Sequence, residues 1–487
     1  MPNAINFVQR FYSKNTIYAL SSGLGKCGVA VIRVTGPNTK DALKYIGGFK
    51  DLPEPRKVML RSLRDVNNGE IIDKGLVLWF PGPKSFTGED SCEFQVHGSV
   101  AVINGISKSL NSIPSISLAE PGEFTRRAFY NGKLDLTEVE GLADLLNAET
   151  EIQRKQAFLQ SQGFLSKMYH QWKDELTRYQ AHVEAMIDFE ESENLGNQMQ
   201  HVFQKVMELK NKLKKHISAG RKGEILKQGV QTVIVGQPNV GKSSLFNILC
   251  GRPAAIVTPI SGTTRDIIEI KLDISGYPVI LSDTAGIRED SDDPIEKEGM
   301  KRAIDQVETA ELVILMMVAH DYYSWIKANK LSTLSDYMKL HLEMLGLEKV
   351  YSDYKQNKKR IIPVINKVDL SLPKNDDNLL CVSCTTGLGI DDLVNQITRQ
   401  LKEICGEPSK EHLCMNNARH REHLKDCLEE LDMFLKNSEA LNSGENIDIV
   451  ILAEHLRRAS KHLGRLVGKT FTDGILDVIF RDFCIGK

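Results

Sequence analysis

The segment Gly236-Gln-Pro-Asn-Val-Gly241-Lys242-Ser243 decides the fold of the central part of this chain. Two glycines separated by four residues and followed by lysine and serine form the pattern of a phosphate-binding loop. The loop follows an apolar run at 232–235 and precedes a helical pattern at 244–249, which is the context that the motif requires. Backbone N–H groups can converge on phosphate oxygens there, and the helix N-terminus adds positive potential. The motif therefore predicts that Lys242 reaches the β- and γ-phosphates of a nucleotide and that Ser243 binds Mg²⁺.

A second motif, Asn366-Lys367-Val368-Asp369, follows the apolar run 361–365 and distinguishes guanine from adenine. The carboxylate of Asp369 can accept hydrogen bonds from both N–H donors on the edge of guanine, and adenine lacks that donor pair. Because an unpaired buried polar group is costly, such a site discriminates strongly. The segment Ser383-Cys384-Thr385 lies where GTPases place a short loop under the base. This explains the C-x-x-C of Cys381 and Cys384 better than redox chemistry or half a zinc site does.

Between these motifs, Asp283-Thr-Ala-Gly286 ends the apolar run 279–282. We expect Asp283 to hold Mg²⁺ through water and Gly286 to sense the γ-phosphate, with Thr264 as the second hydroxyl on Mg²⁺. The next residue is Ile287, which cannot orient a water molecule by hydrogen bonding. Another group must then orient the attacking water, and Glu296 is near in the sequence, although a merely solvated acid in an acidic loop is the alternative.

The composition restricts the function classes. With 487 residues, 41% hydrophobic and 26% charged, the chain is long enough for several domains of ordinary composition. The net charge of -2 argues against indiscriminate binding of nucleic acid but allows a local basic face. No apolar run is long enough to span a bilayer, so membrane insertion is not expected. The nine irregularly spaced cysteines favour a reducing compartment.

Patterning along the chain predicts an α+β multidomain protein. Residues 16–132 have mixed α/β character, whereas 133–229 and 406–487 have helical periodicity. Two late amphipathic helices cannot bury their apolar faces alone, so we expect them to pack on the earlier helices as one discontinuous helical bundle. Residues 230–405 alternate strands and helices and would form an inserted Ras-like α/β P-loop GTPase domain. Residues 1–15, basic and without acids, fit either a targeting peptide or a disordered tail.

Several further segments resemble one family, the MnmE tRNA wobble-uridine modification GTPases. The resemblance covers nearly the whole chain and does not depend on the nucleotide motifs. It is most similar to the organellar branch of eukaryotes, which favours the targeting peptide and a location in the mitochondrial matrix. The segments that carry it are Gly28-Val-Ala-Val-Ile-Arg33, Leu78-Trp-Phe-Pro-Gly-Pro-Lys-Ser-Phe-Thr-Gly-Glu-Asp90, Pro121-Gly-Glu-Phe124, Lys133-Leu-Asp-Leu136 and Phe483-Cys-Ile-Gly-Lys487.

The resemblance implies a homodimer whose N-terminal domain both dimerises and binds a tetrahydrofolate derivative in the 5,10-methylene or 5-formyl form. It implies joint action with an MnmG-like partner, which alone would carry FAD. Together they would install an aminomethyl-type group on C5 of the wobble uridine of mitochondrial tRNAs. The amine would be taurine or glycine, giving a taurinomethyl or a carboxymethylaminomethyl group.

Site residues are implied by the same resemblance. Folate contacts fall on Arg33, Glu93, Lys133 and Lys487, where a carboxylate suits the pterin edge and cations suit a glutamate tail. Glu296 aligns with the catalytic glutamate and would act with Lys242 and Thr264, while Cys484 is either a nucleophile or a packing residue. A K⁺ ion would take the role of an arginine finger. Its ligands would be the side chain of Asn239 and the backbone carbonyls of Thr258, Ile260 and Thr263. The other nucleotide contacts would include Gly236, Val240, Gly241, Ser244 and Lys367.

Two other functions stay open at this point. A ribosome-assembly or RNA-chaperone GTPase of the Era type shares the nucleotide motifs, but no KH-type G-x-x-G module follows them here. A non-catalytic, nucleotide-switched scaffold is the second alternative, and intact Lys242, Ser243, Thr264 and Asp283 argue against it. The basic helix at 457–469 is either a tRNA contact or a solvated helix face.

Overall fold

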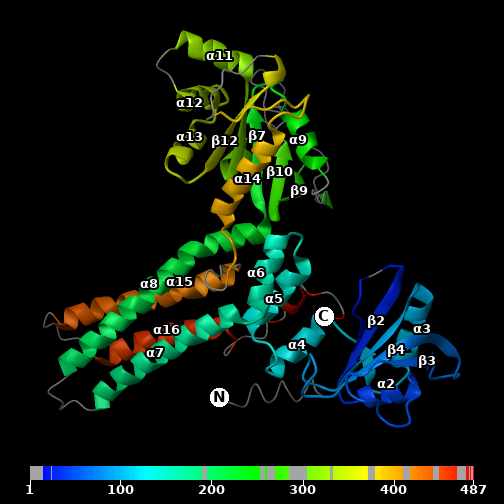
Figure 1. Cartoon of the computed structure of the whole chain (residues 1–487). Coiled ribbons are helices and arrows are strands. Elements are labelled where there is room, and N and C mark those ends of the chain that lie inside the picture. The colour runs from blue at the N-terminus through cyan, green and yellow to red at the C-terminus, as the bar shows by residue number, and fades with distance from the viewer. Residues whose placement is uncertain are drawn as a thin grey trace, which may run out of the picture. The chain divides into compact units, whose positions relative to one another are not determined.

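The structure is a computed structural model of the whole chain (Figure 1). It describes residues 15–23, 25–188, 195–252, 258–259, 269–283, 304–329, 333–370, 379–409, 417–442, 449–468, 476, 479–481, 483 and 486. The chain divides into two compact units. The first contains Met1–Ala143, Gln160–Leu195 and Asn437–Lys487, and the second contains Asp144–Leu159 and Gly196–Lys436.

The first unit begins with a six-stranded sheet of order β3-β4-β5-β2-β1-β6. All neighbouring strands are antiparallel except β1 and β6, which run parallel. Alternating side chains of the strands pack on two helices, α2 (Thr39–Tyr45) and α3 (Val100–Asn111), which cover one face. The strands are β1 (Thr16–Leu20), β2 (Cys27–Thr35), β3 (Met59–Arg64), β4 (Ile71–Phe80), β5 (Ser91–Gly98) and β6 (Ile116–Leu118).

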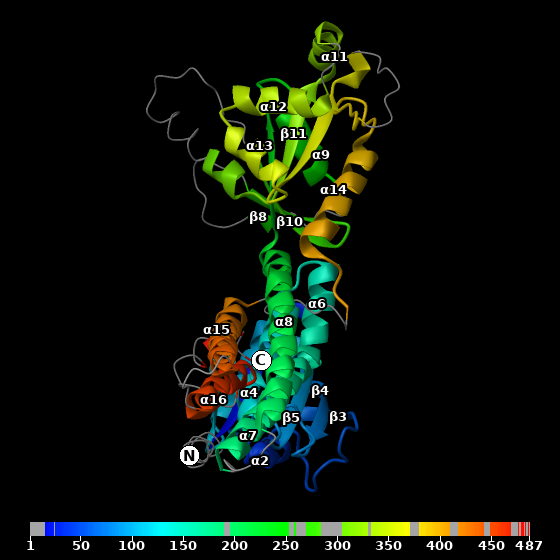
Figure 2. The ribbon, with the colours of Figure 1, turned by 90° about the vertical axis from the view of Figure 1, so that its left-hand side faces the viewer.

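Two long helices of the first unit, α7 (Phe164–Asp188) and α16 (Ile449–Leu466), lie side by side although they are far apart in the sequence (Figures 1 and 2). Their contact buries the apolar row that the sequence indicates on α16, including Leu452, Leu456 and Leu463. Ile451, which the periodicity also assigned to that row, is 47% exposed, because it lies one position outside the buried face. The shorter helices are α4 (Glu123–Tyr130) and α5 (Leu136–Asn147), which ends in the second unit. Helix α6 (Glu151–Ser161) lies almost wholly in the second unit.

The C-terminal segment packs on the N-terminal part of the first unit. Leu476, Phe480 and Phe483 form one apolar cluster with Leu136 and Val139 of α5. The backbone of Phe480 approaches Gly122 so closely that only glycine fits there, because a Cβ on Gly122 would lie 2.3 Å from the carbonyl oxygen of Phe480. Leu476, Phe480 and Phe483 are therefore part of the core of this unit.

The second unit contains the other six-stranded sheet, of order β12-β11-β7-β10-β9-β8. Strands β12, β11, β7 and β10 are parallel, and β9 and β8 continue antiparallel. Helices α9 (Lys242–Cys250) and α14 (Ile390–Cys405) cover one face, and α12 (Leu334–Met344) and α13 (Glu348–Lys355) cover the other (Figures 1 and 2). The strands are β7 (Val230–Gly236), β8 (Thr258–Pro259), β9 (Glu269–Ile274), β10 (Tyr277–Asp283), β11 (Leu312–Val318) and β12 (Arg360–Asn366).

The helices of this sheet domain are α9 (Lys242–Cys250), α11 (Ala319–Ala328), α12 (Leu334–Met344), α13 (Glu348–Lys355) and α14 (Ile390–Cys405), with the 3-10 turn η1 (Val368–Leu370). Helix α8 (Leu195–Gln228) leads into β7, and α15 (Ala418–Asn442) follows α14. Within the second unit α8 and α15 are joined by ion pairs, Lys210 with Asp432 and Arg421 with Glu224. None of the helices in the described part of the chain has the length and apolar content needed to cross a lipid bilayer.

Candidate functional site

The phosphate-binding loop joins β7 to α9 at the carboxyl edge of the second sheet. Its backbone requires glycine at two places, because Gly236 has φ 156° and Gly241 has φ 104°. A Cβ on Gly236 would lie 2.4 Å from the carbonyl oxygen of Met316, and one on Gly241 would lie 2.4 Å from Nδ2 of Asn366. Asn239 is a non-glycine residue in the left-handed region, with φ 62°. The loop is thus the strand–turn–helix structure predicted from its sequence.

Lys242 is held inside this loop. Its Nζ donates hydrogen bonds to the carbonyl oxygens of Gly236 at 2.8 Å and Gln237 at 3.0 Å. The ammonium group is therefore positioned over the turn whose N–H groups are expected to bind phosphate. The side chains of Asn239, Ser243 and Ser244 are exposed on the same loop and the first turn of α9, where a ligand can reach them.

Asn366 connects the guanine motif to the other two loops. This side chain is 1% exposed, and its Nδ2 donates to the carbonyl oxygen of Val240 at 2.6 Å. Its Oδ1 accepts from the backbone N–H of Cys384 at 3.3 Å. One buried amide therefore ties the phosphate loop, the end of β12 and the loop 383–385 together. Lys367 follows with φ 64°, and Asp369 is exposed in η1, free to face a ligand.

The loop 383–385 has the structural features expected of a base-contact loop. Ser383 is fully buried, and its Oγ accepts from the N–H of Thr386 at 3.2 Å. Thr385 is exposed. Burial raises the pKa of the Cys384 thiol, although its hydrogen bond with Asn366 acts in the opposite direction. The thiol therefore stays protonated near neutral pH, which agrees with a loop residue and not with a reactive cysteine.

The expected metal and switch residues are described only in part. Asp283 is the last residue of β10 and pairs in register with Ile234 of β7, so its backbone lies at the same sheet edge as the phosphate loop. Thr258 lies in β8, at the edge of the sheet. Five other expected residues lie outside the described residues, namely Ile260, Thr263, Thr264, Gly286 and Glu296.

In the first unit, Arg33 and Glu93 face each other across β2 and β5. Nη2 and Nε of Arg33 lie 2.9 and 3.0 Å from Oε1 of Glu93, and the two side chains are 22% and 18% exposed. The guanidinium also lies 5.7 Å from the ring centre of Phe86, in the loop 81–90 between β4 and β5. Lys133 reaches the same loop, since its Nζ donates to the carbonyl oxygen of Pro83 at 3.1 Å. The structure thus gathers Arg33, Glu93 and Lys133 around one loop.

The other two expected residues of this group, Cys484 and Lys487, lie outside the described residues. Their neighbour Gly486 is described. Its carbonyl oxygen accepts from Oγ of Ser21 at 3.0 Å, and a Cβ there would lie 2.2 Å from the carbonyl oxygen of Leu20. Gly486 therefore lies beside β1, in the sheet that carries Arg33.

Sequence reasoning missed one buried ion-pair network. Arg127 is 2% exposed, and its guanidinium binds Glu123 at 2.8 Å and Glu89 at 3.0 Å. It also donates to the carbonyl oxygen of Asn15 at 2.9 Å. The network fixes the loop 81–90 through Glu89. The i,i+4 spacing of Glu123 and Arg127 suggests their pairing, but nothing in the sequence shows that the pair is buried or that Glu89 joins it.

The basic helix suggested as a tRNA contact is α16, and its arginines are engaged. Arg457 pairs with Glu184 at 2.9 Å and with Glu454 at 3.0 Å, and Arg458 also binds Glu454. These contacts favour the solvated, ion-paired face over a phosphate-binding one.

The second sheet and its three clustered loops define a P-loop GTPase. Comparison with known proteins shows which GTPases this chain is similar to. The family described as the MnmE helical domain matches residues 136–484, and the family described as the N-terminus of the GTP-binding protein TrmE matches residues 16–133. A mitochondrial 5-taurinomethyluridine tRNA synthase subunit of Homo sapiens (GTPB3) is 45% identical over 97% of this chain and 93% of its own length. The tRNA modification GTPase MnmE of Parvibaculum lavamentivorans is 42% identical over 97% of this chain and 100% of its own length.

The chain therefore belongs to the MnmE family of tRNA modification GTPases. The expected α+β multidomain fold and the tRNA-modifying GTPase function are confirmed, and the Era-type and scaffold alternatives are set aside. The expectation of a mitochondrial protein agrees with the mitochondrial relatives of Homo sapiens and Danio rerio.

Proposed function

We propose that this chain is the GTP-hydrolysing subunit of an enzyme that modifies C5 of the wobble uridine of mitochondrial tRNAs. It would act with an FAD-dependent MnmG-like partner and a one-carbon tetrahydrofolate, and would install a taurinomethyl or carboxymethylaminomethyl group. The observation that carries the proposal is the convergence of the phosphate loop, the guanine motif and the loop 383–385 on Asn366. The similarity to a 5-taurinomethyluridine tRNA synthase subunit over 97% of the chain supports the substrate.

In the nucleotide site, we assign phosphate binding to the loop 236–243 and guanine recognition to Asp369. The ammonium of Lys242 now satisfies two loop carbonyl oxygens, and phosphate oxygens would offer it stronger, charge-assisted hydrogen bonds. Ser243 is exposed at the start of α9, which fits a hydroxyl ligand of Mg²⁺. Mg²⁺ would offset charge that develops on the phosphates, with Thr264 and Asp283 completing its surroundings.

We further propose that Glu296 orients the attacking water, since Ile287 cannot. A K⁺ ion would offset developing charge beside the phosphates, held by the side chain of Asn239 and by backbone carbonyl oxygens of Thr258, Ile260 and Thr263. The fit of Asn239 is favourable, because its left-handed backbone places an exposed amide on the outer turn of the phosphate loop.

The proposed folate site lies around Arg33, Glu93 and Lys133. A half-buried carboxylate paired with a guanidinium can accept hydrogen bonds from a pterin edge, and the ring of Phe86, 39% exposed, offers a stacking surface. Lys133 is exposed next to the same loop and suits the carboxylates of a glutamate tail. Lys487 would join them, because Gly486 is anchored beside β1.

The homodimer is proposed to form through the face of the first sheet that is opposite to α2 and α3. On this face Leu60 of β3 and Leu76 of β4 are directly opposite each other and are 59% and 36% exposed. Leu78 lies two residues after Leu76 on β4, on the same face, and is directly opposite Glu93 of β5. The apolar surface is therefore continuous with the proposed folate residues. Burying it against a second copy would remove apolar surface from water.

The test is mass spectrometry of wobble nucleosides in mitochondrial tRNA. Loss of the protein should abolish the aminomethyl-type modification, and the wild-type chain should restore it. Glu296→Ala should bind GTP normally, hydrolyse it about 10²-fold or more slowly, and fail to restore the modification. Unchanged wobble nucleosides after loss of the protein would refute the proposed function.

A further inference from the structure

Helix α8 carries an unusual concentration of exposed cations in its C-terminal half. Lys214, Lys215, Arg221 and Lys222 are all exposed, and no acidic residue occurs in the stretch 209–223. Lys215 and Lys222 are seven residues apart, as are Lys214 and Arg221. Seven residues make nearly two turns and rise about 10 Å, so each pair projects from the same side of the helix. Successive residues of a helix are about 100° apart, so the four cations form two neighbouring rows, which together are called the basic strip.

The three lysines of the basic strip are not neutralised by carboxylates of the described residues. Elsewhere on α8, Lys205 pairs with Glu208, Lys210 with Asp432 and Lys227 with Asp144. By contrast, Lys214, Lys215 and Lys222 form no ion pair with any carboxylate in the described part of the chain. Arg221 differs from them, because its charge acts on Glu311. In a chain of net charge -2, such a strip is a local feature and not a consequence of overall composition.

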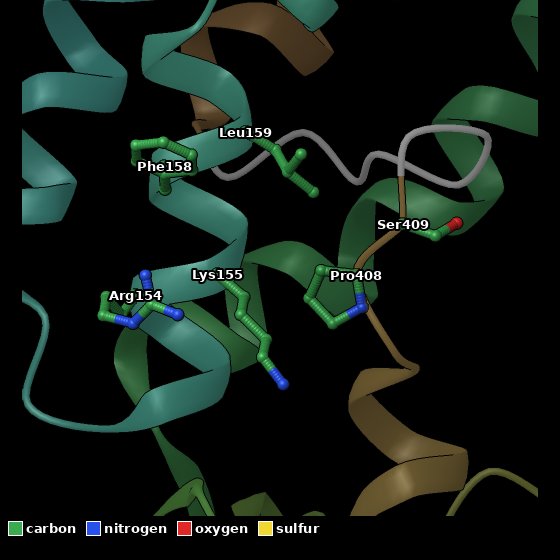
Figure 3. A pocket seen from close by; sticks show the side chains of 6 residues that line it. All are labelled: Arg154, Lys155, Phe158, Leu159, Pro408 and Ser409. Carbon is green, nitrogen blue, oxygen red and sulfur yellow. The ribbon is translucent and has the colours of Figure 1, made fainter.

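The strip continues to a cavity within the same unit. Cδ of Lys222 lies 3.8 Å from where a Cβ on Gly406 would be, and the chain runs on from Gly406 to Pro408 and Ser409. These two residues and α6 line a cavity of about 300 Å³ (Figure 3). Lys155 points from α6 towards Pro408 in this view. The lining is completed by Arg154, Phe158 and Leu159.

The cavity has the chemistry of a nucleotide-contact surface. Lys155 and Arg154 share a single carboxylate, that of Glu151, so one positive charge remains in excess there. Phe158 is 45% exposed and offers an aromatic face beside these cations. RNA-binding surfaces typically combine cations that follow the phosphate backbone with an aromatic side chain that can contact a base or ribose.

We propose that Lys214, Lys215 and Lys222 of α8, continued by Lys155 at the α6 cavity, bind the sugar–phosphate backbone of the tRNA. The inference rests on the proposed function, since it supplies the binding surface for that substrate. The three lysines of α8 have no ion pair to break when they displace counterions from phosphates, whereas Arg457 and Arg458 of α16 would first have to leave Glu184 and Glu454. Binding through α8 would therefore be independent of base sequence and steeply dependent on salt.

The experiment measures the affinity of the full chain for a fluorescein-labelled tRNA transcript by anisotropy, over a series of salt concentrations. The triple variant K214Q/K215Q/K222Q should bind about ten-fold or more weakly at low salt. The slope of log affinity against log salt should fall by about 2 to 3, because three phosphate contacts are lost. GTP turnover and the unfolding temperature should stay at wild-type values.

The matched control is R457Q/R458Q/K461Q, which removes three positive charges from α16 and should leave the affinity and its slope nearly unchanged. An unchanged slope in the α8 variant would overturn the proposal, and so would an equal loss in the control. If the wild-type chain restores wobble modification while the α8 variant keeps full tRNA affinity, the proposed tRNA surface is refuted and the proposed function stands. If the wild-type chain neither binds tRNA nor restores the modification, the proposed function fails as well.

Discussion

Nδ2 of Asn366 donates a hydrogen bond of 2.6 Å to the carbonyl oxygen of Val240, so the guanine motif and the phosphate loop are one structure. Val240 lies in the middle of the phosphate loop, 126 positions earlier in the chain. The bond is buried, and buried hydrogen bonds are the costly ones to lose. The two loops should therefore respond together when Asn366 is changed.

Asn366→Ala should weaken GTP binding by about ten-fold or more. It leaves the carbonyl of Val240 and the N–H of Cys384 without their partner, and about 1.4 kcal/mol corresponds to a factor of ten. Titration calorimetry with GTP or GDP measures the affinity of the variant. Asn247→Ala, at an exposed position of α9, is the control and should bind normally. Equal affinities of the two variants would show that Asn366 does not hold the site together.

Asp369→Asn should reduce affinity for GTP and improve that for xanthosine triphosphate. The amide presents a donor where the carboxylate accepts, and xanthine offers an acceptor at that edge. Because Asp369 is exposed in η1, the substitution should leave the unfolding temperature unchanged. Competition between the two nucleotides gives the ratio directly. A preference unaltered from wild type would remove Asp369 from the base site.

GTP turnover should be faster in K⁺ than in Na⁺ at equal ionic strength, and Asn239→Ala should flatten the difference. Asn239 is exposed on the phosphate loop with φ 62°, and alanine removes the only side-chain oxygen proposed as a K⁺ ligand. Phosphate release in the two chloride salts is the measurement. GTP affinity of the variant, measured without turnover, serves as the control. Equal wild-type rates in both salts would exclude the K⁺ site and leave the GTPase assignment intact.

Gly486→Ala should impair folate binding and tRNA modification while leaving GTP turnover near normal. The added Cβ would lie 2.2 Å from the carbonyl oxygen of Leu20, so the C-terminal motif must move away from β1. Gly69→Ala is the matched control, because Gly69 also has positive φ, 73°, but open space around it. Equilibrium binding of 5-formyltetrahydrofolate compares the two. Equal folate affinities would show that anchoring of the C-terminus does not matter for the folate site.

Stability should fall as the pH decreases from 6.5 towards 4. Burial, together with the charge of His420 on α15, lowers the pKa of His216 to about 4. Over this window the unfolded chain binds a proton at His216 that the folded chain does not bind, which favours unfolding by up to about 3 kcal/mol. Urea unfolding across the window should be less pH-dependent in His216→Leu. His201→Leu, at an exposed position of α8, should keep the wild-type dependence, and the same slope in all three proteins would contradict this origin.

The local structure of the nucleotide site was predictable from the sequence. Each nucleotide motif follows an apolar run, and the runs at 232–235, 279–282 and 361–365 are all inside the observed β7, β10 and β12. Parallel strands that alternate with helices place their following loops at one sheet edge, so the phosphate loop and the guanine motif had to meet. Short edge strands such as β8 and β6 were not predicted, because two or three residues leave no periodic signal.

The sequence by itself determined the motifs, their order and the family, because phosphate loops and base-recognition loops depend on residues that are adjacent in the chain. The tertiary structure decided which distant groups share an environment. It pairs Arg33 with Glu93, buries Arg127 between Glu123 and Glu89, and leaves Lys214 and Lys222 unpaired in the part of the chain that it describes. Whether a charge is buried, paired or free depends on contacts between segments far apart in sequence, and a linear pattern does not contain them.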